Sequence, residues 1–236
     1  MRRIKIRVAE KPTLLPTCVM RDPLVLDRRR FLGVMLMVPG ALSVAGKTRI
    51  QLPTPNAKLG CDLIDALKAR HSTREYSARP LAAEILSTLL WAGFGVNRPR
   101  SGGRTAPSAH GWQEIGVYVA LPEGLYRFDA PAHALELTVE QDVRALTGVQ
   151  DFVGVAPVDL VYVADFARMS EASEDDRLFF SACDAAVIAQ SVYLYCAAAG
   201  LNTVVRGLVD RKRLAAAMRL RREQRIVLAQ TVGFSA

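Results

Sequence analysis

The sequence predicts an α+β fold in which one sheet is surrounded by helices. The first evidence is a mostly apolar strand at 158–164, because such a strand is typically buried on both faces of a sheet. The second is a helical segment at 175–199 with apolar and small residues nearly all round, which indicates a helix enclosed by its own domain or by a partner subunit. The third is a length of 236 residues with 50% hydrophobic residues, which suits one domain plus an extension.

The positive charge is concentrated near the N-terminus. The chain has a formal net charge of +8, and residues 1–45 supply most of it. The body is nearly neutral, so we expect no binding to nucleic acid. The 4 cysteines form no Cys-x-x-Cys pair, and no histidine stands at metal-ligand spacing from them, so no metal site is predicted.

Residues 1–45 are predicted to be a signal peptide of the twin-arginine type. Arg28, Arg29 and Arg30 precede Phe31-Leu32 and a short apolar run that ends in small residues at 43–45. That run is too short for an ordinary spanning helix, so no stable membrane span is expected after processing. The expected location is periplasmic or otherwise exported. A cytoplasmic protein with an amphipathic or buried N-terminal helix is the alternative, and Met20 competes with Met1 as the start.

The body begins with a linker and two helices. Residues 46–60 are polar and contain prolines, so they are predicted to be the linker that precedes a domain at 61–236. Apolar residues at helical spacing predict helices at 61–69 and 82–94. The segment 95–111 is rich in Gly, Pro, Ser and Arg, and a loop of this length is typical of a functional segment.

Shorter elements complete the domain. A hairpin is predicted around Gly124, followed by a short helix at 139–147. Gly200 is expected to end the long helix, and Asp210 is expected to cap a further helix that precedes a last strand at 226–232. The cysteines of the long helix are expected to be buried thiols, and His133 is expected to be exposed.

Two clusters could support chemistry. Arg70-His71-Ser72-Thr73-Arg74 gathers guanidinium, imidazole and hydroxyl donors at the end of a helix, which suits a phosphate. The alternative is that these cations only complement the helix dipole. The segment 101–109 has small residues and accessible backbone amides that could approach a flat ring, or it could be a flexible loop.

Taken in order along the chain, these segments resemble the nitroreductase-like FMN flavoproteins, nearest the branch called SagB-type dehydrogenases. The resemblance covers about residues 60–235 and is carried by segments at 70–76, 90–99, 104–109, 112–115, 124–126, 199–207 and 230–234. It implies a nitroreductase-like fold with a central mixed or antiparallel sheet flanked by helices. It also implies an intertwined homodimer with FMN at the subunit interface.

The resemblance assigns roles to individual residues. The FMN phosphate and ribityl chain would be bound by Arg70, His71, Ser72 and Arg74, with Gly233 near the phosphate. The FMN held by the other subunit would be reached by Pro107, Ser108 and Ala109. The isoalloxazine ring would be lined by Val205, Arg206 and Gly207. His110 is a candidate proton donor, or else a surface loop residue.

The implied function is an FMN-dependent oxidoreductase that acts on a small planar or unsaturated compound by ping-pong flavin chemistry. NAD(P)H is a possible electron donor, and an exported protein could instead use a redox protein or quinol. Relatives commonly carry Asn where this chain has Gly111, and many end in a cation where this chain has Phe234-Ser235-Ala236. These departures keep open a degenerate or non-catalytic module that binds flavin or a small ligand.

Overall fold

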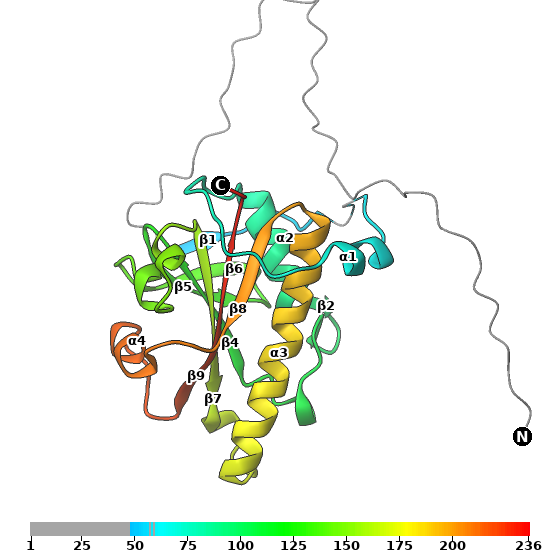
Figure 1. Cartoon of the computed structure of the whole chain (residues 1–236). Helices are drawn as coiled ribbons and strands as arrows, with labels where there is room; N and C mark the ends of the chain where they lie inside the picture. Colours follow the sequence, from blue (N-terminus) through cyan, green and yellow to red (C-terminus); the bar gives the residue numbers. More distant parts are fainter. Residues whose placement is uncertain (1–47, 57, 59) are drawn as a thin grey trace, which may run out of the picture.

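The computed structural model describes residues 48–56, 58 and 60–236, and the predicted signal segment at 1–45 lies outside them. Its centre is a seven-stranded antiparallel sheet with the order β1-β6-β5-β4-β7-β9-β8 (Figure 1). The strands are β1 (Arg49–Gln51), β4 (Ile115–Leu121), β5 (Gly124–Asp129), β6 (Ala134–Val139), β7 (Val158–Asp165), β8 (Asn202–Arg206) and β9 (Gln224–Gly233). The helices around the sheet are α1 (Leu63–Ala69), α2 (Ala83–Phe94), α3 (Glu174–Ala198) and α4 (Arg211–Ala217). The predicted α+β architecture is therefore confirmed, and its sheet is antiparallel.

Strand β7 divides the hydrophobic core into two layers. Leu160 and Tyr162 face the layer formed with α2 and α3, whereas Val161 and Val163 face the layer formed with α4. All of β7 except its last residue is buried. Successive side chains of a strand point to opposite faces, so a strand covered on both faces is mostly apolar. The charged residue within it, Asp159, is buried with a cationic partner, Arg206.

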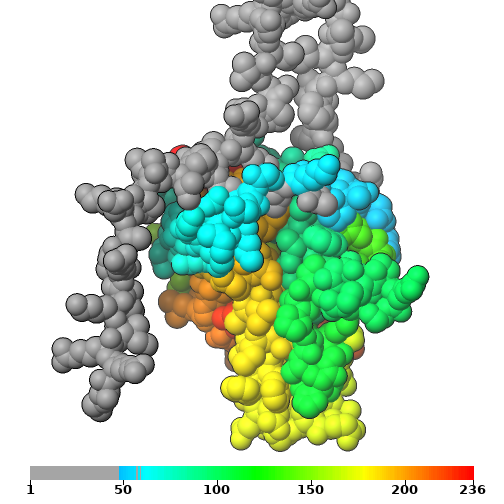
Figure 2. Space-filling model, turned by 90° about the vertical axis from the view of Figure 1, so that its right-hand side faces the viewer, coloured from blue at the N-terminus to red at the C-terminus, as the bar shows by residue number. Residues whose placement is uncertain are grey.

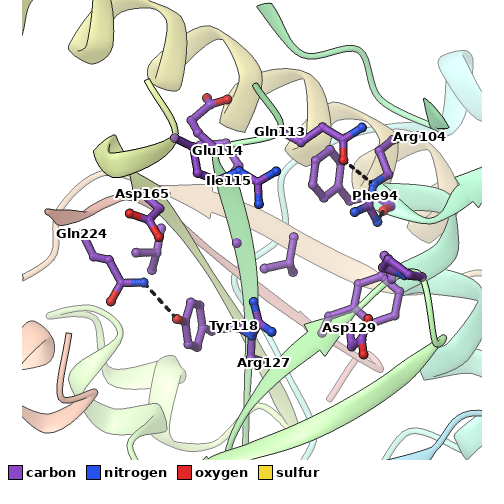
Figure 3. Close-up of a pocket in the computed structure, with 17 residues that line it drawn as sticks. Phe94, Arg104, Gln113, Glu114, Ile115, Tyr118, Arg127, Asp129, Asp165 and Gln224 are labelled. Atoms are coloured by element: carbon purple, nitrogen blue, oxygen red, sulfur yellow. Dashed lines mark hydrogen bonds between the residues drawn. The ribbon is translucent and has the colours of Figure 1, made fainter. Parts of the chain in front are cut away.

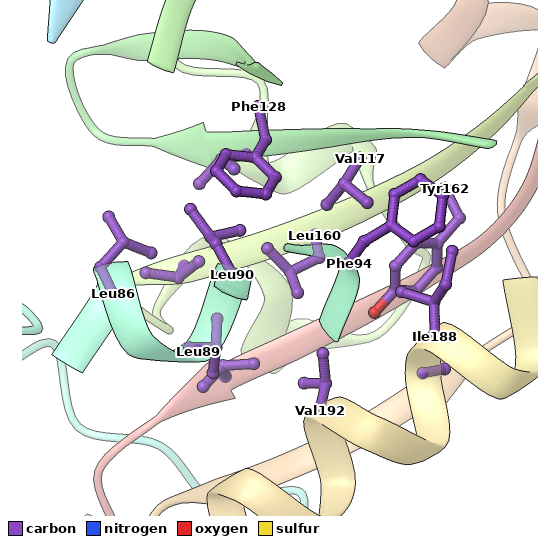
Figure 4. Packing of buried hydrophobic residues seen from close by; sticks show 14 of the residues in the cluster. Leu86, Leu89, Leu90, Phe94, Val117, Phe128, Leu160, Tyr162, Ile188 and Val192 are labelled. Carbon is purple, nitrogen blue, oxygen red and sulfur yellow. The ribbon is translucent and has the colours of Figure 1, made fainter. Parts of the chain in front are cut away.

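The layer beneath α2 and α3 is the larger one. Figure 4 shows Leu89 and Leu90 of α2 and Ile188 and Val192 of α3 converging on the sheet beside Tyr162. The Tyr162 hydroxyl group satisfies its hydrogen-bonding capacity by donating to Gln230 Oε1 at 2.6 Å. Fully burying one aliphatic side chain contributes roughly 1.5–3 kcal/mol, so this layer stabilises the position of α3 on the sheet.

Helix α3 is bounded by local signals. The Ser173 hydroxyl group accepts a hydrogen bond from the Asp176 amide at the N-terminus. At the other end Gly200 takes a φ of +66°, and the Leu201 amide donates to the Cys196 carbonyl. This is the Schellman geometry that favours glycine, and it confirms the predicted end of the helix.

By length and composition α3 could cross a membrane, since it has 25 residues and contains an 18-residue window with a mean hydropathy of 1.4. Its packing explains that composition, because α3 contacts α1, α2, β8 and β9. The other side of α3 is exposed, so its own domain does not enclose the helix all round, and enclosure by a partner subunit stays a prediction.

Several segments differ from the sequence-based expectations. Residues 49–51, inside the predicted linker, form edge strand β1 and pair with β6. The predicted helix at 139–147 is reduced to one turn, η2 (Arg144–Leu146). The residues before it form strand β6, which pairs antiparallel with β5 and ends at Val139. The loop at 95–111 contains a small hairpin of β2 (Val96–Arg98) and β3 (Gly103–Arg104), and then the turn η1 (Ala109–Gly111). The remaining turns are η3 (Asp151–Gly154) and η4 (Phe166–Arg168).

Two side chains also differ from expectation. Cys183 is exposed, whereas Cys196 on the same helix is buried as expected. His133 is half-buried, and its Nε2 lies 2.7 Å from Ser87 Oγ and 3.1 Å from the Pro53 carbonyl oxygen. Burial lowers the pKa of His133, which favours the neutral ring. The contact with Ser87 connects α2 to the start of β6.

Candidate functional site

The Arg70–Arg74 segment lies along the free edge of the sheet. The Thr73 amide donates to the Thr203 carbonyl at 3.0 Å, and the Thr203 amide donates to Thr73 Oγ1 at 2.8 Å. Because β8 is an edge strand, its outward backbone groups are available to this segment. The chain that follows α1 is thereby fixed beside β8.

Tyr193 of α3 connects the predicted cofactor residues of this edge. Its hydroxyl group lies 2.9 Å from Ser72 Oγ and accepts a hydrogen bond of 2.9 Å from the Val205 amide. The Arg70 guanidinium lies 5.5 Å from the centre of the Tyr193 ring, within cation–π range. We call Arg70, Ser72, Tyr193 and Val205 the edge cluster.

Arg70 and Arg74 are the predicted phosphate-binding cations of this edge. Among the residues that the structure describes, neither Arg70 nor Arg74 forms an ion pair. Arg74 and His71 are exposed, and the His71 ring is held by a 2.7 Å contact between Nδ1 and the Ala69 carbonyl. Unneutralised guanidinium groups at an accessible edge suit an anionic group such as a phosphate ester.

Arg206 differs from the other arginines of this region. Its side chain is buried and forms an ion pair with Asp159 of β7, with 2.7 Å between Nη2 and Oδ1. It also donates to the Thr147 carbonyl and to Thr231 Oγ1. The guanidinium group therefore joins β8 to the sheet interior, and only the backbone of Arg206 could face a ligand at the edge.

The two glycines of the prediction lie in different surroundings. Gly207 is exposed, and the nearest atom to a side chain added there is at 4.0 Å, so the backbone is accessible. Gly233 is buried, and an added Cβ would meet Pro157 at 2.8 Å and Tyr76 at 3.2 Å. Packing alone is therefore a sufficient reason for glycine at 233.

The Ser108–Ala109 turn is anchored on buried carboxyl groups. The Ala109 amide donates to Asp184 Oδ2 at 2.9 Å, and the Ser108 hydroxyl group donates to Glu114 Oε2 at 3.3 Å. Burial, with a smaller contribution from the charge of Asp184, raises the pKa of Glu114. Glu114 is 1% exposed, and its Oε1 has no hydrogen-bond partner among the described side chains and backbone groups. We call Ser108, Ala109, Glu114 and Asp184 the loop cluster.

The backbone of this loop adopts unusual conformations. His110, Gly111 and Gln113 have φ values of 51°, 71° and 47°, which lie in the left-handed region. The cost for the two non-glycine residues is offset by local contacts, since the Gln113 amide donates to Ser108 Oγ at 2.8 Å. The His110 ring lies 4.4 Å from that of Trp112 and packs edge-on against Phe180 of α3. These contacts give the predicted flavin loop a defined shape.

The two clusters lie on opposite sides of α3. Asp184 and Tyr193 are nine positions apart on this helix, which corresponds to two and a half turns and about 13 Å along the axis. The predicted cofactor residues Arg70, Ser72 and Val205 therefore lie together on the Tyr193 side of α3. Ser108 and Ala109 lie on the Asp184 side. Pro107 is exposed next to the latter pair.

Comparison with known proteins places this arrangement in a family. Residues 67–234 match the family described as "Nitroreductase family". The chain belongs to the nitroreductase family. A curated relative, "Putative nitroreductase MJ1384" of Methanocaldococcus jannaschii, is 32% identical over 152 residues, which cover 60% of this chain and 76% of the relative.

Solved structures agree with that membership. The crystal structure described as a putative nitroreductase from Ralstonia eutropha JMP134 is 50% identical and has a TM-score of 0.78, covering 80% of this chain and 90% of its own. The NADPH:FMN oxidoreductase of Vibrio harveyi, solved in complex with NAD+, is 19% identical with a TM-score of 0.56, and the match covers 73% of this chain and 68% of that one. This second likeness supports the nitroreductase fold only.

Three important side chains of this chain could not be identified from the sequence alone. Tyr193 and Asp184 were treated only as parts of a helix, and Glu114 only as part of a matching segment. A polar signal did exist for Asp184, because a charged residue within an apolar helical stretch needs a partner when buried. No comparable signal marks Tyr193. Within the described ranges, no group of three or more His, Cys, Asp or Glu side chains could hold a metal ion.

Proposed function

We propose that this nitroreductase is an FMN-dependent oxidoreductase, nearest the SagB-type branch, that acts on a small planar or unsaturated compound. The observation that carries the proposal is the edge cluster, where Arg70 and Ser72 meet Tyr193 and the backbone of β8. Its donors fit the phosphate and ribityl hydroxyl groups of FMN. When bound, the flavin supplies the redox chemistry, and the protein orients it.

The residues of the chain would divide the binding between them. Arg70 and Arg74 would neutralise the phosphate charge, and Ser72 would hydrogen-bond the ribityl chain or phosphate. The accessible backbone at Gly207 would lie beside the ring. The Val205 amide already donates to Tyr193, so this nitrogen would contact the ring only if the tyrosine moved. His110 is exposed and could donate a proton to a reduced substrate.

The loop cluster supports a homodimer as the functional unit. Pro107, Ser108 and Ala109 lie on the other side of α3 from Arg70, so they would complete the FMN site of a second subunit. An exposed apolar surface is available for such an assembly. Figure 2 shows α1 and α3 side by side on one face, where Leu63, Ile64, Phe179 and Val187 are exposed.

Sedimentation provides a test of this assembly. We expect the body of the protein to sediment as a dimer, and Phe179→Glu to shift it toward monomer because a charge would be buried at the interface. Val149→Glu is the matched control, since Val149 is comparably exposed at 59% but lies outside the α1–α3 face. A monomer in the unsubstituted protein would contradict the proposed dimer.

We further propose export through the twin-arginine segment and NAD(P)H as a possible electron donor. Replacing Arg28 and Arg29 by Lys should retain the protein in the cytoplasm, as measured by fractionation. Anaerobic titration with NADH should bleach the flavin absorbance if NADH is a direct donor. A flavin that NADH and NADPH leave oxidised would instead favour a redox protein or quinol.

The absorbance spectrum tests the central proposal. The purified protein should show flavin absorbance, or acquire it with added FMN, and Arg70→Ala combined with Arg74→Ala should abolish it. The control is Arg213→Ala with Arg222→Ala, which removes the same charge from exposed positions in and just after α4. Full flavin retention in the Arg70/Arg74 variant would contradict the assignment. A protein that never takes up FMN would support the non-catalytic alternative.

A further inference from the structure

A hollow opens where two neighbouring strands of the sheet separate. Strand β4 pairs with β7 from Ile115 onward, but it pairs with β5 only from Tyr118 onward. The hollow, of about 220 Å³, lies between the unpaired start of β4 and the end of β5 (Figure 3). Water occupies about 30 Å³ per molecule, so the space suits a small molecule and exceeds a single water.

Two arginines at this hollow lack acidic partners. Arg104 and Arg168 both line it, and neither forms an ion pair within the part of the chain that the structure describes. Burial, and secondarily the charge of Arg168, lowers the pKa of Arg104. The charge of Asp129 opposes this and raises the pKa of Arg104 to a smaller extent. An anion bound between Arg104 and Arg168 would reduce the remaining repulsion between the two guanidinium groups.

Both guanidinium groups are oriented by bonds that leave other donors available. Arg104 donates through Nε to Gln113 Oε1 at 3.1 Å and through Nη1 to the Phe94 carbonyl at 3.4 Å. Arg168 donates through Nε to the Trp112 carbonyl at 2.9 Å. Nη2 of Arg104 and both terminal nitrogens of Arg168 make no hydrogen bond to the described residues. Such preorganised donors are well suited to an oxyanion.

The carboxyl groups around the hollow are already engaged. Asp165 accepts from Arg221, and Asp129 accepts from Arg49 and from the Ala132 amide. The carboxyl group of Glu114 is directed toward α3 (Figure 3), and it accepts a hydrogen bond from the Ser108 hydroxyl group of the loop cluster. Within the described part of the chain, none of the three forms an ion pair with Arg104 or Arg168, although the charge of Asp129 acts on Arg104 from a distance.

We propose that this hollow is a binding site for an oxyanion, the carboxylate or phosphoryl end of a small polar molecule, held by Arg104 and Arg168. Gly116 leaves space in the hollow, because a Cβ atom added at this position would lie 3.3 Å from the Tyr118 ring, which also lines it. Gln113 and Trp112, which orient the two arginines, follow the predicted flavin loop directly. The ligand would therefore stabilise the base of that loop. The site itself does not depend on FMN binding.

Thermal denaturation of the full protein with inorganic phosphate or succinate tests this site. Ionic strength is held constant with NaCl, and every measurement is repeated in the Arg70→Ala, Arg74→Ala background so that the edge cluster cannot supply the response. We expect a saturable rise in Tm with at least one of the two anions. Arg104→Gln and Arg168→Gln should each weaken the apparent affinity at least tenfold. Arg100→Gln, an exposed position in the same loop, should leave it unchanged.

The outcomes distinguish a phosphoryl ligand from a carboxylate ligand and show whether the proposed anion site exists. Saturation with phosphate alone identifies a phosphoryl ligand, and saturation with succinate alone identifies a carboxylate. Gly116→Val should abolish the response without changing any charge. Because Arg168 is exposed, its variant should fold normally by circular dichroism. The proposal is overturned if neither anion saturates, or if Arg100→Gln weakens binding as much as Arg104→Gln. Loss of flavin in the double variant has no bearing on this result.

Discussion

The edge cluster and the loop cluster use opposite electrostatics on the two sides of α3. The edge cluster holds the Arg70 cation and hydroxyl groups on an accessible sheet edge, and Arg70 forms no ion pair with the described residues. The loop cluster holds buried carboxyl groups that form no ion pair with a described cation, beneath a backbone with several positive φ values. An accessible cation can bind an external anion, whereas a buried carboxyl group must be satisfied by protein donors. The first arrangement is suited to ligand binding and the second to fixing the shape of a loop.

The same contrast holds between Arg70 and Arg206. Both were predicted to contact FMN, but Arg70 stacks near Tyr193 at the edge while Arg206 is buried against Asp159. A guanidinium group with several protein acceptors contributes to the sheet, and one without acidic partners remains available for a ligand. Chemical type alone does not distinguish these roles.

The largest effect is expected for Arg206→Met. This change leaves the Asp159 carboxyl group buried without its cation, which should lower the free energy of unfolding by about 3–5 kcal/mol. Urea denaturation followed by circular dichroism measures the loss. Arg211→Met is a control, because Arg211 is exposed and contacts only backbone carbonyls at 3.0 Å. Equal losses in the two variants would contradict the structural role of Arg206.

A smaller effect is expected for Asp184→Ala, which tests whether the loop cluster fixes the loop. The Ala109 amide would lose its acceptor, at a cost of about 1–3 kcal/mol in stability. Asp184→Asn keeps an oxygen acceptor and should retain most of the stability. If the site spans two subunits, Asp184→Ala should also accelerate FMN release. Unchanged release kinetics with reduced stability would restrict Asp184 to a folding role.

Tyr193→Phe should have a more modest effect confined to the edge cluster. The substitution keeps the ring beneath Arg70 but removes the hydroxyl group that joins Ser72 to Val205. A lost hydrogen bond of this kind is worth about 0.5–1.5 kcal/mol, so the Kd for FMN should rise up to about tenfold. Fluorescence titration measures it. Tyr195→Phe is the control, because Tyr195 also lies on α3 but its hydroxyl group donates to the Ile85 carbonyl of α2, away from the edge cluster.

The smallest effect concerns pH and Glu114. Its raised pKa favours the protonated carboxyl group in the fold, so its contribution to stability is fully present below the unfolded pKa of about 4.3. That contribution is lost as the pH rises through the folded pKa. Glu114→Gln removes this titration, so the variant should gain stability relative to the original protein between pH 4 and pH 7. A constant difference in Tm across this range would contradict the shift.

Local patterns were sufficient for the framework of the fold. The apolar run of β7 predicted burial on both faces, and Asp210 predicted a helix start that the structure confirms through its bond to the Arg213 amide. Strand β6 was missed although apolar Leu135, Leu137 and Val139 alternate with polar residues, which is the pattern of a half-buried strand. Its pairing with β5 and β1 completes the sheet on that side. Edge strand β1 depends in the same way on its neighbour.

The sequence by itself determined the α+β class and the principal helices, because periodicity and capping are local properties. It also carried, through the order of its matching segments, the resemblance to the family to which the chain belongs. The tertiary structure decided which polar groups meet. Ser72 reaches Tyr193 across 121 positions, and Arg206 reaches Asp159 across 47. Such contacts depend on how α3 and β8 pack against the sheet, and no local spacing encodes that geometry. For this reason the edge and loop clusters could be separated only in three dimensions.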